Sequence, residues 1–134
     1  MLQNNWLEAQ EDTPGMLADR WVNINQEIIS TSDISSIAIS WFNVDSSTPT
    51  TAFLSTSYGT TCVYTSLKTD NYWRMTYGGE LIDRSGYNVR FAIPATAFPR
   101  DSKHIQAEFT VTPTTGSAFP VIYKFNVVKK LYGT

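Results

Sequence analysis

The side chains of this chain that could carry out chemistry are few and widely spaced. The one histidine, His104, stands beside Lys103 and just after the loop Pro99–Ser102. A hydrolase would need it as a base, with a nucleophile and an orienting carboxylate nearby, and the spacing supplies neither. An exposed histidine at the start of a strand is the simpler interpretation. For the one cysteine, Cys62, a small buried hydrophobe is likewise simpler than a reactive thiol.

The acidic residues and glycines give equally little indication of a reaction site. Glu80 and Asp83 are two nearby carboxylates of the kind that a glycosidase needs, but solvated loop acids explain them more plainly. Gly78-Gly79 lacks the Lys-Ser or Lys-Thr and the helix that a phosphate-binding loop requires. One histidine, one cysteine and scattered acids are too few for a zinc or calcium site. We therefore expect no enzymatic activity, no metal and no cofactor.

Aromatic residues are the one chemical class in surplus, at 13% of the chain. Tyr72 and Tyr77 lie on a predicted strand with Trp73 and could form a platform on which a sugar ring stacks. The same residue types also fill the space between two packed sheets. A carbohydrate-binding module that uses exposed Tyr72 and Tyr77 on a surface glycan is therefore the alternative function.

Length and charge exclude several classes of protein. The 134 residues are enough for one domain with its own core, and a net charge of −2 excludes a strongly basic nucleic-acid binder. No segment approaches the roughly 18 apolar residues of a membrane span, and the N-terminus lacks the pattern of a signal peptide. We expect a protein made in a cytoplasm, without a nucleic-acid or membrane partner. Thirty residues are serine or threonine, so hydroxyl groups make up much of the polar surface.

Alternation of apolar and polar residues is the main structural signal. It is strongest over residues 87–93, 105–112 and 121–128, which predicts an antiparallel meander. Prolines 94 and 99 predict one helical turn or a tight crossover between the first two of these strands, with Phe98 in the core. A strand and a loop recur about every ten residues, the rhythm of a β-sandwich or barrel. Earlier strands are predicted over residues 21–25, 34–44, 51–54, 61–67 and 72–77.

The first 19 residues lack this alternation, and Thr13-Pro14-Gly15 breaks the chain. The expected organisation is an extended N-terminal arm over residues 1–19 and a single sandwich domain over residues 20–134. The arm is acidic, whereas Lys129 and Lys130 make the other end basic. It is either a docking arm or a frayed terminus. For a docking arm, the expected partner-binding residues are Trp6, Leu7, Met16, Leu17, Lys129 and Lys130.

Several segments resemble the immunoglobulin-like β-sandwiches of structural proteins from tailed bacteriophages. The segments that carry the resemblance are Thr31–Trp41, Gly86–Pro94, Phe109–Val111 and Phe125–Val127. The resemblance implies an all-β, antiparallel immunoglobulin-like sandwich without catalytic residues, and the chain departs from antibody domains in lacking paired cysteines. It implies a non-enzymatic virion protein, a capsid decoration or a tail- or baseplate-associated module made in the host cytoplasm. Its partners would be its own copies, as a homo-oligomer, or a capsid or tail protein.

Overall fold

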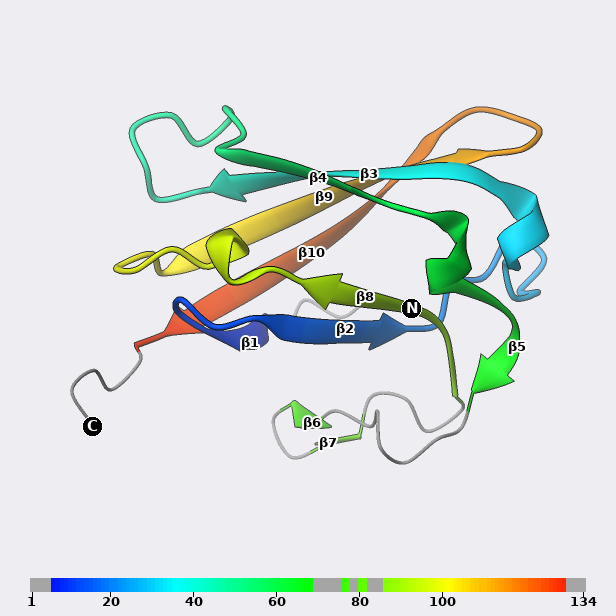
Figure 1. The fold of residues 1–134 in the computed structure, drawn as a ribbon, viewed down its shortest axis with the longest axis horizontal. Coiled ribbons are helices and arrows are strands. Elements are labelled where there is room, and N and C mark those ends of the chain that lie inside the picture. The colour runs from blue at the N-terminus through cyan, green and yellow to red at the C-terminus, as the bar shows by residue number, and fades with distance from the viewer. Residues whose placement is uncertain (1–5, 69–75, 78–79, 82–85, 130–134) are drawn as a thin grey trace.

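Two β-sheets whose inner faces share one hydrophobic core make up most of the described chain (Figure 1), and Thr76–Tyr77 pairs with Glu80–Leu81 in a separate two-stranded sheet. The computed structural model describes residues 6–68, 76–77, 80–81 and 86–129. The strands of the larger sheet turn one face to the core and the other outward, which is what alternating apolar and polar residues dictate. The predicted all-β class is confirmed.

Along the described chain, ten strands are interrupted by three single turns of 3-10 helix. In order, they are β1 (Leu7–Gln10), β2 (Gly15–Asp19), η1 (Thr31–Asp33), β3 (Ile34–Asn43), β4 (Leu54–Tyr58), η2 (Thr60–Cys62), β5 (Val63–Lys68), β6 (Thr76–Tyr77), β7 (Glu80–Leu81), β8 (Tyr87–Ile93), η4 (Ala95–Ala97), β9 (His104–Pro113) and β10 (Phe119–Val128).

The larger sheet has the strand order β1-β10-β9-β3-β4. Strand β9 pairs antiparallel with both β3 and β10, whereas β1 runs parallel to β10. The inward residues of the central strands form the middle of the core, and Trp41, Ile105 and Phe109 are each 0% exposed. The predicted strand over residues 34–44 is confirmed, but the strand predicted over residues 51–54 begins only at Leu54.

The smaller sheet has the strand order β2-β8-β5, with β8 at its centre. Phe91 of β8 meets Phe109 of β9 across the core, with ring centroids 4.9 Å apart. Strands β8 and β9 therefore lie in opposite sheets, so the predicted continuous meander over residues 87–128 is wrong. Proline cannot donate to a ladder, and Pro94 with the expected helical turn η4 carries the chain across the core, where Phe98 is buried.

The N-terminal segment belongs to both sheets, which differs from the predicted arm outside the sandwich. Residues Leu7–Gln10 pair with β10, and residues Gly15–Asp19 pair with β8. Leu17 is 2% exposed and part of the core. The chain crosses from one sheet to the other between these two strands, so each strand is short, with four and five residues. Neither is long enough to show a clear alternation of apolar and polar residues. The described residues 6–19 are therefore part of the sandwich.

No strand forms over residues 21–25, where the sequence predicted one. Val22 and Ile28 form a single bridge, and the Oδ1 of Asn23 accepts hydrogen bonds from the backbone N–H groups of Asn25 and Glu27. This local side-chain bonding replaces a ladder, as is typical of asparagine. The segment is fixed instead by Asn88, which is 0% exposed and bonds to the backbone of Trp21 at two points and to the carbonyl of Ile29 at a third.

Candidate interaction surface

The outer face of the larger sheet is broad and carries few charges. Residues in register across its strands form two rows of side chains that point outward. The first row is Ser57, Ala38, Thr110 and Pro120, and the second is Ser55, Ser40, Glu108 and Ile122. Ser36 and Thr112 extend the same surface, which we name the hydroxyl face. Within these two rows, Glu108 is the one ionisable residue.

An aromatic residue borders the hydroxyl face on the side of β1. Trp6 is 36% exposed, and its ring lies over His104 with ring centroids 5.0 Å apart. The Nζ of Lys124 lies 5.7 Å from the centroid of the Trp6 ring, a cation–π distance. The Nδ1 of His104 is 2.8 Å from the Oδ2 of Asp45. Trp6 therefore packs on its own sheet, and half-buried His104 belongs to this polar contact.

The structure separates the residues that the sequence grouped as partner-binding. Leu17 lies in the core, where it cannot contact a partner, and Leu7 points inward and packs against the core from β1. Met16 lies on the outer face of the smaller sheet, opposite Ala92. Exposed Lys129 forms an ion pair with Asp101 at 3.6 Å, and Lys130 lies outside the described residues. Trp6, Met16 and Lys129 thus remain at the surface.

The predicted sugar-stacking residues cannot be placed in a site. Tyr72 lies outside the described residues, as does Asp83, while the structure describes Tyr77 and Glu80 only as members of the short strands β6 and β7. The carbohydrate-binding alternative therefore stays a prediction from the sequence.

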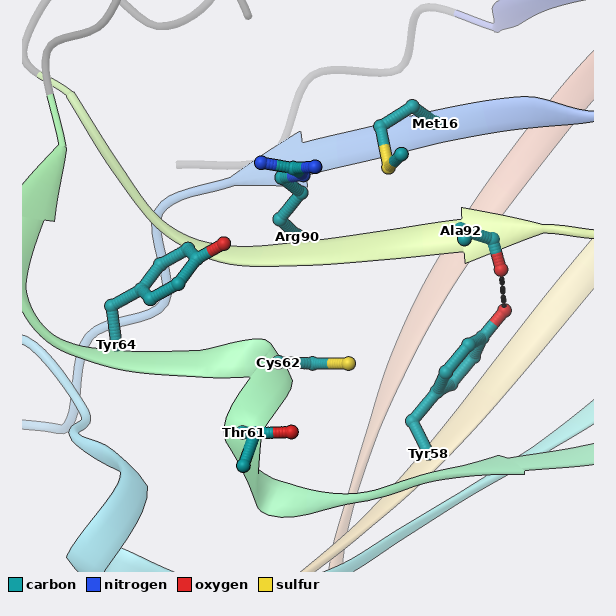
Figure 2. A pocket seen from close by; sticks show the side chains of 7 residues that line it. All are labelled: Met16, Tyr58, Thr61, Cys62, Tyr64, Arg90 and Ala92. Carbon is teal, nitrogen blue, oxygen red and sulfur yellow. Dashed lines mark hydrogen bonds between the residues drawn. The ribbon is translucent and has the colours of Figure 1, made fainter.

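A hollow of about 270 Å³ opens between β4, η2 and β8 (Figure 2). Seven residues line it: Met16, Tyr58, Thr61, Cys62, Tyr64, Arg90 and Ala92. The Tyr58 hydroxyl donates a hydrogen bond to the carbonyl of Ala92, as the dashed line in Figure 2 marks. The volume is below the roughly 300–1,000 Å³ of sites for small organic ligands, and the bond takes up the proton of Tyr58.

Burial keeps the two weak acids of this hollow protonated. It raises the pKa of Tyr58 to about 12, with the nearby Cys62 adding to the effect. Burial also raises the pKa of the Cys62 thiol, although the positive charge of Arg90 opposes the shift. Because the thiolate is the nucleophilic form of cysteine, the raised pKa disfavours a reactive Cys62, although the residue is not fully buried as the sequence predicted. It is half-buried against the core.

A buried polar network that sequence analysis missed joins the two sheets at Asp19. The Tyr123 hydroxyl accepts a hydrogen bond from the Nε1 of Trp21 at 2.8 Å and donates one to the Oδ2 of Asp19. Burial raises the pKa of Asp19, while the bonds from Tyr123 and from the Arg20 backbone oppose the shift. Tyr123 lies 104 residues from Asp19 and 102 residues from Trp21, so no local pattern could have revealed the network.

Neither a metal centre nor a membrane-crossing helix is present in the described part of the chain. No three histidine, cysteine, aspartate or glutamate residues gather there into a set that could hold a metal ion. Nor does any of its helices have the length and apolar character to cross a membrane. No protein-family model, curated protein or solved structure matches this chain.

Proposed function

We propose that this protein is a non-enzymatic structural component of a virion, a capsid decoration or tail-associated module built on an immunoglobulin-like sandwich. The observation that carries the proposal is the hydroxyl face, a wide outward surface on the larger sheet whose two rows hold one ionisable residue, Glu108. Burying a charge against another protein is costly, and this face brings one such group to a contact. A face of this kind suits attachment to another protein surface better than it suits catalysis.

The order of strands supports the immunoglobulin-like part of the proposal. Variable-type immunoglobulin domains place strands G, F, C and C′ in one sheet and B, E and D in the other. Here β10-β9-β3-β4 and β2-β8-β5 follow the same order. Those domains also bury a tryptophan on strand C, and Trp41 of β3 is 0% exposed. Leu17 on β2 and Phe109 on β9 fill the core in place of a disulfide between the two sheets.

The test asks whether the chain is part of virus particles and whether it attaches through the hydroxyl face. Peptides of this chain should be found by mass spectrometry in particles purified through high-salt washes. Their absence from such particles would overturn the proposal.

Attachment through the hydroxyl face is tested by rebinding of the purified protein to particles from which it has been removed. Thr110→Lys places a charge in the middle of the face and should lower the bound amount at least tenfold. Thr96→Lys is the matched control, because Thr96 is exposed on η4 and belongs to neither row of the hydroxyl face. Equal binding of the two variants would contradict attachment through this face.

A further inference from the structure

The strand β4 ends the larger sheet and leaves one backbone edge without a neighbour among the described strands. Its other edge pairs with β3 over Leu54–Tyr58, in five consecutive register pairs without a bulge. An unpaired edge presents a row of N–H and C=O groups to any strand of suitable length. The regular pairing on the β3 side means that this row is straight.

The sequence gives β4 none of the features that usually block such an edge. Edge strands are commonly protected by charges, prolines, bulges or extreme shortness. The five-stranded and three-stranded sheets have four edge strands in all. The three besides β4 carry charges, namely Glu8 on β1, Asp19 on β2 and Lys68 on β5. By contrast, no aspartate, glutamate, lysine or arginine occurs between Ser46 and Leu67. Strand β4 is the uncharged edge.

The inward side chains of β4 hold this edge in place before any partner arrives. The Oγ1 of Thr56 accepts a hydrogen bond from the Nε1 of Trp41 at 3.1 Å. Tyr58 bonds to the carbonyl of Ala92, and its ring centroid lies 5.1 Å from that of Phe91. A strand that is already fixed loses little conformational entropy on pairing.

We propose that β4 pairs antiparallel with β4 of a second copy of this chain, about a two-fold axis at Thr56. This register places Thr56 opposite Thr56 of the second copy, Ser55 opposite its Ser57 and Leu54 opposite its Tyr58. All five residues of each strand then have a partner, and the absence of charge removes repulsion between identical strands. An antiparallel pair of identical strands is a closed two-fold arrangement, so assembly stops at the dimer.

The pairing would join the five-stranded sheet of one copy to the same sheet of the second copy, giving one sheet of ten strands. Exposed Ser55 and Ser57 lie in the two rows of the hydroxyl face, so two copies of that face become continuous across the axis. Small hydroxyl side chains directly opposite each other are favourable cross-strand pairs. The inference rests on the proposed function in one respect, since it names the surface through which the module would assemble.

The first experiment changes the charges at Ser55 and Ser57, which face each other across the axis. In Ser55→Lys/Ser57→Lys, every lysine would lie opposite a lysine of the second copy. In Ser55→Lys/Ser57→Glu, every lysine would lie opposite a glutamate. Light scattering during size exclusion, over a range of concentrations, should give a dimer for the wild type, a monomer for the first variant and a dimer for the second. Far-ultraviolet circular dichroism checks that both variants are folded.

The second experiment tests the register in a Cys62→Ser background. Directly opposite residues have Cβ atoms about 4.5–5.5 Å apart, and diagonal ones about 7–8 Å, whereas a disulfide needs about 3.5–4.5 Å. Ser55→Cys and Ser57→Cys should each cross-link poorly alone and form a disulfide-linked dimer when the two proteins are mixed and oxidised. Equal cross-linking of the single proteins and the mixture would overturn the register.

A wild type that stays monomeric at every concentration would overturn the inference, and so would a folded lysine double variant that remains a dimer. Neither result touches the proposed function, which is decided by the presence of the chain in virus particles. Conversely, a dimer that follows the predicted charges would stand even if the chain were absent from such particles.

Discussion

The two edges of the larger sheet are built in opposite ways. On one side β1 runs parallel to β10, and the chain then crosses over the end of the sandwich to become β2 of the smaller sheet (Figure 1). On the other side β4 is antiparallel to β3, and no described strand pairs with its outer edge.

The crossing after β1 closes that end of the molecule with specific bonds. The N–H of Glu11 donates to the carbonyl of Val128 at 3.0 Å, and the N–H of Asp12 donates to that of Phe98 at 2.8 Å. The Glu11 side chain is 1% exposed, and its Oε2 accepts a hydrogen bond from the N–H of Asp101 at 2.9 Å. The β1 side is therefore committed to the fold, whereas β4 keeps its edge available for pairing.

The largest expected effect comes from deleting residues 1–19. A chain that begins at Arg20 lacks β1, β2 and the core residue Leu17, whose side chain alone is worth about 2–5 kcal/mol. Since whole domains are stable by only about 5–15 kcal/mol, the shortened chain should be unfolded. Circular dichroism and thermal melting check this. A cooperative transition for the shortened chain would show that the β1 side is dispensable.

A smaller but still severe effect is expected from Asn88→Ala. Asn88 accepts a hydrogen bond from the N–H of Trp21 and donates two, to the carbonyls of Trp21 and Ile29. Its loss leaves buried groups unpaired, at about 1–3 kcal/mol each, so the free energy of unfolding should fall by at least about 3 kcal/mol in urea titrations. Asn126→Ala is the control, because Asn126 is exposed on β10, and a matching loss there would contradict this assignment.

Asp19 should give the protein a stability that depends on pH. Because burial raises its pKa above the ordinary 3.8, the folded state binds the proton more tightly than the unfolded state. The stability that protonated Asp19 contributes is fully present below pH 3.8 and is lost as pH rises through the raised pKa. It amounts to about 1.4 kcal/mol for each unit by which the pKa of the folded state exceeds that of the unfolded state. In urea titrations at several pH values, the stability of Asp19→Asn relative to wild type should rise over that window. A constant difference would show that Asp19 ionises normally.

The smallest effect is expected at the border of the hydroxyl face near β1. Trp6→Ala removes the ring that packs on His104 and lies near Lys124. The loss should be about 0.5–1.5 kcal/mol, the usual value of one aromatic or cation–π pair. Thermal melting checks it, with Trp6→Phe as the variant that keeps an aromatic ring. Indistinguishable melting temperatures of Trp6→Ala and wild type would show that the Trp6 ring does not stabilise this edge.

Sequence periodicity predicted the long strands because burial of one face imposes it locally. The strands over residues 34–43, 104–113 and 119–128 follow from it, whereas the turn at Ala95–Ala97 follows from the two prolines that flank it. The exchange between sheets at Pro94 and the two short strands before Arg20 are set by distant partners, β8 and β10, which alternation does not identify.

The candidate interaction surface could be predicted only in part from the sequence. Alternating serines at positions 36 and 40 and threonines at 110 and 112 mark outward positions, but only the strand register puts them side by side. Leu17 shows the reverse error, since an apolar residue in a polar segment suggested a contact for a partner and instead fills the core.

The parallel pairing of the first and last strands also determines how the molecule would respond to force. Leu7, Glu8, Ala9 and Gln10 lie in register with Phe125, Asn126, Val127 and Val128. Tension applied before Leu7 and after Val128 pulls the two strands along their length in opposite directions. Their connecting hydrogen bonds are then loaded together in shear and cannot be opened one at a time. A module with this arrangement resists stretching far better than a hairpin pulled open from its free ends.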